Sequence, residues 1–119
     1  MQPRSRKELV AQLIEGRSPI APLRTELAAY PWDLDEPLVI LRSSHIEAIL
    51  RRYMANDLTA ANVAEWAEAL EMRDDVGFDD EHSQALSRAI FVLANPDVNG
   101  PLTLERAERL MVEITHRTA

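Results

Sequence analysis

The chain has 119 residues, of which 46% are hydrophobic and 28% are charged, and its formal net charge is −7. This composition is too apolar for a disordered chain, and the length suits a single helical domain over residues 1–119. Cysteine is absent, which excludes disulfides and cysteine-based catalysis or metal binding and favours the cytoplasm as the compartment. No apolar run approaches the ~20 residues that cross a bilayer, and no signal peptide is recognisable, so we expect neither membrane insertion nor secretion.

Two short helices are predicted at the N-terminal end. A capping box that starts at Ser5 precedes apolar residues with helical spacing, and Gly16 then supplies a left-handed end. This pattern predicts a helix over residues 6–15. Pro19 suits the first turn of a second helix, which we expect over residues 20–29.

The next segment is expected to be irregular and then extended. Residues 30–37 are rich in proline and acidic side chains, which predicts a loop held down by Trp32. Residues 38–41 are all aliphatic and predict a buried strand. Because no partner strand is recognisable in the chain, this segment is expected to be either a strap across the core or an edge between molecules.

Helical spacing returns after this strand. A second capping box at Ser44 predicts a helix that runs to about residue 55, and Thr59 is expected to cap the helix that follows. Residues 73–80 contain four aspartates and a glycine, and we expect a turn there.

The C-terminal third predicts two more helices. Residues 81–94 are apolar over most of a helix circumference, which is typical of the most buried helix of a bundle. Residues 95–101 contain two prolines and a glycine and predict a turn, after which Thr103 is expected to cap the last helix. The fold class that we predict is all-α.

We expect a compact bundle of about five or six helices with one short extended segment over residues 38–41. Trp66 and Phe91 are the aromatic side chains that the helical spacing places in the core.

The acidic charge is concentrated in residues 57–81, which contain nine acidic residues and one arginine. A local negative field attracts cations or basic surfaces and repels phosphates. Helical spacing places three of these carboxylates on the solvent side of one helix, and two more follow in the next turn. We predict that these five residues bind a basic protein surface: Glu65, Glu68, Glu71, Asp74 and Asp75. A plainly solvated helix face is the alternative explanation of the same residues.

Metal, cofactor and nucleic-acid binding are not predicted. The aspartates between residues 74 and 80 lack the spacing of a calcium-binding loop, and the three histidines form no His-x-x-x-His pair. The net charge of residues 57–81 opposes the phosphate attraction on which nucleic-acid affinity depends. An enzyme site built from Arg42, His45 and Glu47 has only their proximity in the sequence in its favour.

Two stretches of the chain resemble a group of small uncharacterised bacterial all-helical proteins. They are residues 58–78, which include Trp66, Ala67, Arg73, Asp74 and Asp75, and residues 93–96, which read Leu93, Ala94, Asn95 and Pro96. The resemblance runs from about residue 32 to residue 114 and implies a helical fold and a bacterial source. In size and charge the chain is also similar to the small acidic immunity proteins, which neutralise basic nuclease toxins by presenting carboxylates on helices.

These observations predict a non-enzymatic protein-interaction module. We expect it to present an acidic helix face to a basic partner, as an immunity or inhibitory protein does. The alternative is a homodimeric structural or regulatory helical protein that buries residues 38–41, or Tyr53 and Met54, across a two-fold axis.

Overall fold

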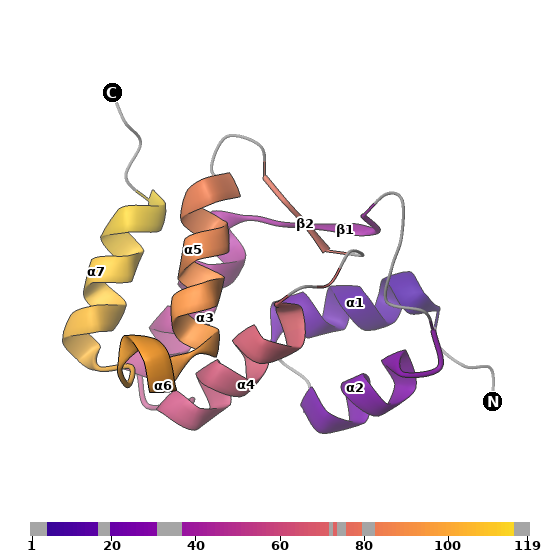
Figure 1. Cartoon of the computed structure of the whole chain (residues 1–119), viewed down its shortest axis with the longest axis horizontal. Coiled ribbons are helices and arrows are strands. Elements are labelled where there is room, and N and C mark those ends of the chain that lie inside the picture. The colour runs from indigo at the N-terminus through magenta and orange to yellow at the C-terminus, as the bar shows by residue number, and fades with distance from the viewer. Residues whose placement is uncertain are drawn as a thin grey trace.

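Helices dominate the part of the chain that the computed structural model describes, which comprises residues 5–16, 20–30, 37–71, 73, 76–79 and 83–115. Trp32 and the loop expected around it lie outside these residues. In chain order the elements are α1 Arg6–Glu15, α2 Ile20–Leu27, β1 Val39–Leu41, α3 Ser43–Met54, α4 Ala60–Leu70, β2 Val76–Phe78, α5 Ser83–Ala94, α6 Pro96–Asn99 and α7 Leu104–Thr115 (Figure 1).

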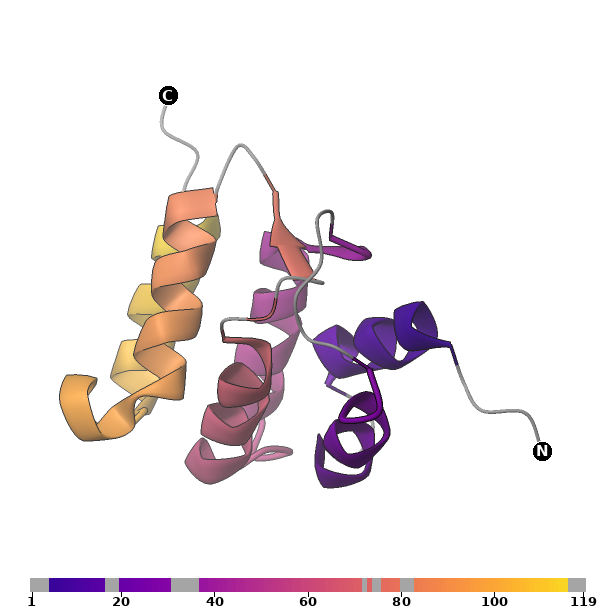
Figure 2. The same ribbon diagram turned by 45° about the vertical axis from the view of Figure 1, so that its right-hand side comes forward.

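The helices are arranged as successive pairs along the long axis of the molecule. α5 and α7 lie side by side at one end, α3 and α4 form the middle, and α1 and α2 lie at the other end (Figures 1 and 2). Packing joins α4 to α5, α3 to α7 and α1 to α4. Every helix in the described part of the chain is too short or too polar to cross a membrane.

Local capping signals place the first helix as predicted. The side-chain oxygen of Ser5 accepts a hydrogen bond of 3.2 Å from the backbone N–H of Glu8, which satisfies a donor that the first turn leaves unpaired. Gly16 ends α1 with a φ of 66°, in the left-handed region that glycine enters without steric cost. Both predicted ends are therefore confirmed.

The predicted caps of α4 and α7 are also confirmed. The hydroxyl of Thr59 accepts a 3.1 Å hydrogen bond from the Asn62 N–H, and that of Thr103 accepts one of the same length from the Arg106 N–H. Each threonine thus fixes the residue at which its helix begins.

The predicted cap of α3 is wrong. This helix begins at Ser43, so Ser44 lies inside it, and Arg42 is the N-cap residue. The Arg42 N–H donates to Nδ1 of His45 over 2.9 Å. β1 ends at Leu41 and leaves a single residue in which to turn, so the helix begins before the serine that sequence spacing favoured.

A two-stranded parallel sheet corrects two predictions about the strands. β1 pairs with β2 in the register Val39 with Val76, Ile40 with Gly77 and Leu41 with Phe78. The segment over residues 38–41 therefore has a partner in the chain, and part of the turn predicted over residues 73–80 is a strand. Parallel strands need a long crossover, which α3 and α4 provide (Figure 1). The fold is mostly helical with this small sheet, rather than purely helical.

One further segment differs from the prediction. Residues 95–101 were expected to form a turn, and they contain the single helical turn α6. Pro96 occupies the first helical position, where proline's missing N–H and fixed φ are favourable. With α6, the described residues contain one helix more than the upper prediction of six.

The core takes side chains from every described element except α6. Trp66 is 2% exposed, and its indole Nε1 donates to the Leu13 carbonyl over 2.8 Å, which anchors α4 to α1. Its predicted burial is confirmed. Phe91 is 47% exposed, so its predicted burial is wrong. α5 buries the face that carries Leu86 and Ile90, and Phe91 lies one residue, or about 100°, away from that face.

Candidate functional site

The acidic face that the sequence predicts lies on the solvent side of α4. Glu65 and Glu68 are both exposed and stand three residues apart, so they are neighbours on the helix surface. The opposite side of α4 is buried through Val63, Trp66 and Ala67. No ion pair between described residues involves Glu65 or Glu68. The structure therefore brings these two carboxylates together and leaves them open to a partner.

Glu71 differs from the other two glutamates of this face because it is half-buried and hydrogen-bonded. Its Oε2 accepts a 3.0 Å hydrogen bond from the side-chain amide of Asn95, and the same amide nitrogen donates to the Phe91 carbonyl over 2.8 Å. Glu71 thus ties the end of α4 to the end of α5. Asp74 and Asp75, the remaining predicted residues, lie outside the described residues.

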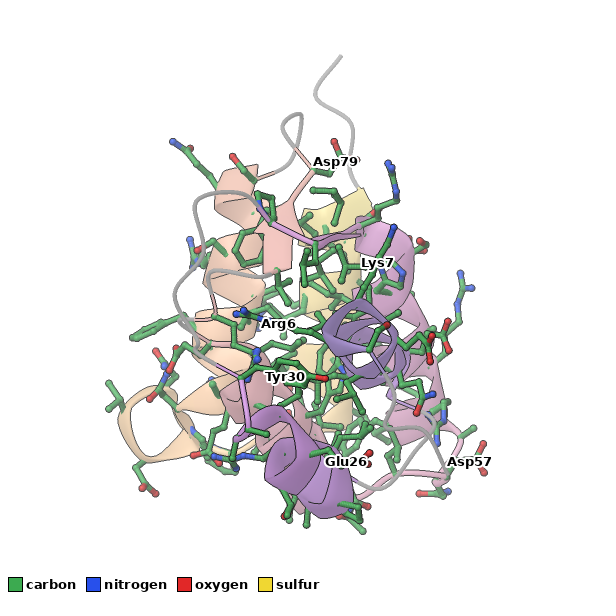
Figure 3. All side chains as sticks on the ribbon, turned by 90° about the vertical axis from the view of Figure 1, so that its right-hand side faces the viewer. Arg6, Lys7, Glu26, Tyr30, Asp57 and Asp79 are labelled. Carbon is green, nitrogen blue, oxygen red and sulfur yellow. The ribbon has the colours of Figure 1, made fainter. Side chains whose placement is uncertain are left out.

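A cleft of about 380 Å³ borders the acidic face on the side of α2. Two arginines, Arg24 and Arg73, and two glutamates, Glu68 and Glu71, line this cleft. Tyr30 lines the same cleft, and Figure 3 shows it in the space between α1 and α2. Glu65 does not line this cleft, so Glu68 is the exposed carboxylate of the acidic face that shares the cleft with basic side chains.

Arg24 could not be linked to the acidic face from the sequence. It is a single exposed arginine in α2, and only the packing of α2 against α4 makes it line the same cleft as Glu68. Arg24 lies far from residues 57–81 in the sequence, so the charge of that stretch alone does not include it.

Two residues of the enzyme hypothesis, Arg42 and His45, are hydrogen-bonded to each other, and the third, Glu47, pairs with Arg51. His45 Nδ1 accepts the Arg42 N–H, Arg42 pairs with Asp79 at 3.6 Å, and Glu47 pairs with Arg51 at 3.5 Å. Burial lowers the pKa of His45 from its ordinary value; the carboxylate of Glu15 opposes this and the guanidinium of Arg42 adds to it. A neutral imidazole with Nδ1 as an acceptor suits a helix cap.

The residues of the homodimer alternative are mostly packed within the chain. Leu41 is fully buried, Met54 packs against the core, and the Tyr53 hydroxyl donates to the Leu102 carbonyl over 3.1 Å. Ile40 is the exception, with 37% of its side chain exposed.

Metal-binding side chains do not converge in the part of the chain that the structure describes: no three histidine, aspartate or glutamate side chains lie close enough together to hold a metal ion.

Fold and site together define a mostly helical domain that carries a small parallel sheet and an exposed pair of carboxylates on one helix. No protein-family model matches the chain, and no curated protein or solved structure is similar enough to count as a match. The resemblance to small bacterial helical proteins and to acidic immunity proteins therefore stays a prediction.

Proposed function

We propose that the protein is a non-enzymatic interaction module that binds a basic protein surface through the acidic face of α4, as an immunity or inhibitory protein does. The observation that supports this function is the exposure of Glu65 and Glu68, one turn apart and in no ion pair with any described residue. Asp74 and Asp75 extend the face in the sequence.

The rigidity of α4 also favours binding. The helix is capped by Thr59 at its start, anchored by Trp66 in its middle and held by Glu71 at its end. The backbone positions of Glu65 and Glu68 are therefore fixed relative to each other, and little further ordering of the backbone is needed when a partner binds. Complementary charge would accelerate encounter with a basic partner, and salt would screen that attraction.

The first prediction concerns the variant Glu65→Gln/Glu68→Gln, which removes two charges and keeps the size of both side chains. We expect it to capture a basic protein from the source cell's lysate about tenfold less strongly than the native chain, because each exposed ion pair contributes up to ~1 kcal/mol. High salt should reduce capture by the native chain to the level of the variant. Glu71 is left in place because it holds Asn95.

A matched control removes two charges from another helix. Glu105 and Glu108 are exposed on α7 with the same spacing, so Glu105→Gln/Glu108→Gln changes the net charge equally and should leave capture unchanged. Equal loss in both variants would show that net charge alone matters, and undiminished capture by the α4 variant would exclude this face as the binding site.

A further inference from the structure

A second charged feature lies on α5, α6 and α7, away from the exposed side of α4. A pocket of about 190 Å³ there is lined by three arginines and one glutamate, together with Asn99 and the apolar side chains Val92 and Leu110. The charged residues are Arg88, Arg106, Arg109 and Glu113. The residues that line the pocket therefore carry a formal charge of +2 on a chain of net charge −7.

Helical spacing explains why these side chains converge. Arg88 and Val92 are four residues apart on α5, and Arg106, Leu110 and Glu113 follow one another at intervals of four and three residues on α7. Such residues share one side of a helix. Since α5 and α7 pack side by side (Figure 1), the two sets face a common groove.

The guanidinium groups retain donors for a ligand. Arg106 Nη1 donates to the Asn99 carbonyl, which fixes this side chain and leaves most of its five N–H groups unused. Arg109 pairs with Glu105 at 3.6 Å, but both side chains are largely exposed, so this pair is weak. Arg88 takes part in no ion pair between described residues.

An apolar pocket of about 120 Å³ adjoins the arginine pocket, and Val92 and Arg106 line both. Its other walls are apolar residues of α4, α5, the start of α6 and the turn that precedes α7: Ala60, Ala61, Val63, Ala64, Leu93, Pro96, Gly100, Pro101 and Leu102. This volume is well above the ~10–15 Å³ that holds one water molecule, so the pocket has room for a short hydrocarbon chain. An apolar space of this size beside positive charge suits an amphipathic anion.

We propose that this groove binds a small aliphatic carboxylate, with the carboxylate among the three arginines and the hydrocarbon chain in the apolar pocket. The planar guanidinium fork matches the two carboxylate oxygens. Glu113 lowers the positive charge of the pocket, which favours a singly charged carboxylate over a phosphate. Glu65 and Glu68 do not line the groove, so this inference is independent of the proposed partner-binding face.

The inference can be tested by titrating the isotope-labelled chain with hexanoate and following the backbone amide resonances. We expect saturable shifts confined to residues that line the two pockets. Acetate should bind more weakly, by up to about fourfold for each methylene that it lacks, and hexylammonium should not bind. Inorganic phosphate should bind more weakly than hexanoate.

Two double variants decide whether the arginines are responsible. The variant Arg88→Gln/Arg109→Gln should weaken hexanoate binding at least about tenfold, because each of its two substitutions removes a charge-assisted hydrogen bond to the carboxylate. Both side chains are exposed, so the fold should persist. Arg42→Gln/Arg51→Gln removes two exposed arginines outside the groove and should have no effect. Absence of saturable hexanoate binding, tighter binding of phosphate, equal affinity for acetate, or equal loss in both variants would each overturn the inference.

Discussion

Gly16 shows how one residue links the local structure to the core. Its φ of 66° ends α1, and a Cβ added there would overlap Cδ1 of Ile49 and lie 3.3 Å from the Trp66 ring. Its carbonyl accepts a 2.7 Å hydrogen bond from Arg52 Nη1. α1, α3 and α4 therefore meet at a position where an added methyl group would have to displace the Ile49 side chain.

We predict that Gly16→Ala destabilises the chain by about 2–5 kcal/mol, since the left-handed conformation costs ~1–2 kcal/mol and overpacking costs ~1–3 kcal/mol. Urea unfolding would measure this loss. Ile49→Val removes the Cδ1 that the new methyl would contact, so Gly16→Ala/Ile49→Val should be more stable than the sum of the single changes implies. Strictly additive losses would contradict the contact between these two positions.

Local signals gave four of the five predicted helix caps. Ser5, Gly16, Thr59 and Thr103 act within one turn of a helix, and the structure confirms each of them. Ser44 failed because β1 ends at Leu41 and α3 begins one residue before the predicted capping box. Phe91 failed because α5 is apolar on several sides, so periodicity does not identify its buried face; only the packing of α5 against α4 and α7 does.

At the scale of elements, α3 and α4 begin with the same hydrogen bond made by different side chains. In α4 the Thr59 N–H donates to Oδ1 of Asn62 over 2.9 Å, and in α3 the Arg42 N–H donates to Nδ1 of His45 over 2.9 Å. An amide oxygen accepts at any pH, whereas an imidazole nitrogen accepts only while it is unprotonated. The start of α3 is therefore sensitive to pH and that of α4 is not.

We predict that the chain loses stability as the pH falls below the ordinary histidine value of about 6.5. Burial lowers the pKa of His45 in the folded state, so the unfolded chain binds the proton more readily. The stability that unprotonated His45 contributes is fully present above the pKa of the unfolded chain. It is lost as the pH falls through the lower pKa of the folded chain. The lost cap is worth up to about 1 kcal/mol.

The variant His45→Asn gives α3 the acceptor that α4 already has. Urea unfolding of both proteins between neutral pH and mildly acidic pH should show a smaller loss for the variant. Because every other titrating group is shared, the difference reports on His45. Parallel losses in the two proteins would show that this cap does not titrate.

β2 was missed by sequence analysis because non-local contacts stabilise it. β2 is three residues long and stands between acidic residues, too short for an alternating pattern, and its pairing with β1 spans the whole of α3 and α4. The groove was missed for the same reason: Arg88, Arg106 and Arg109 become neighbours only when α5 packs against α7. Glu65 and Glu68 were found because they are one turn apart in one helix.

At the scale of the whole molecule, we infer the oligomeric state from the exposed apolar residues and from the two charged sites, the acidic face of α4 and the arginine groove. The large apolar side chains that are clearly exposed in the described residues come from four elements, β1, α5, α6 and α7: Ile40, Phe91, Val98, Leu104 and Val112. A stable homodimer buries ~1,200 Å² or more in one continuous patch. The homodimer alternative buries residues 38–41, and Ile40 is the one large apolar side chain of that segment that is clearly exposed.

We therefore predict that the chain is a monomer, which leaves the acidic face free for a different protein. Sedimentation at high micromolar concentration and moderate salt should give the mass of one chain, 13.5 kDa, for both the native protein and Ile40→Lys. A concentration-dependent dimer that Ile40→Lys dissociates would contradict the prediction and favour the homodimeric structural or regulatory role, because a charge placed at a buried two-fold contact faces its own copy. A dimer that dissociates only in high salt would instead indicate that the α4 carboxylates of one molecule bind the arginine groove of another.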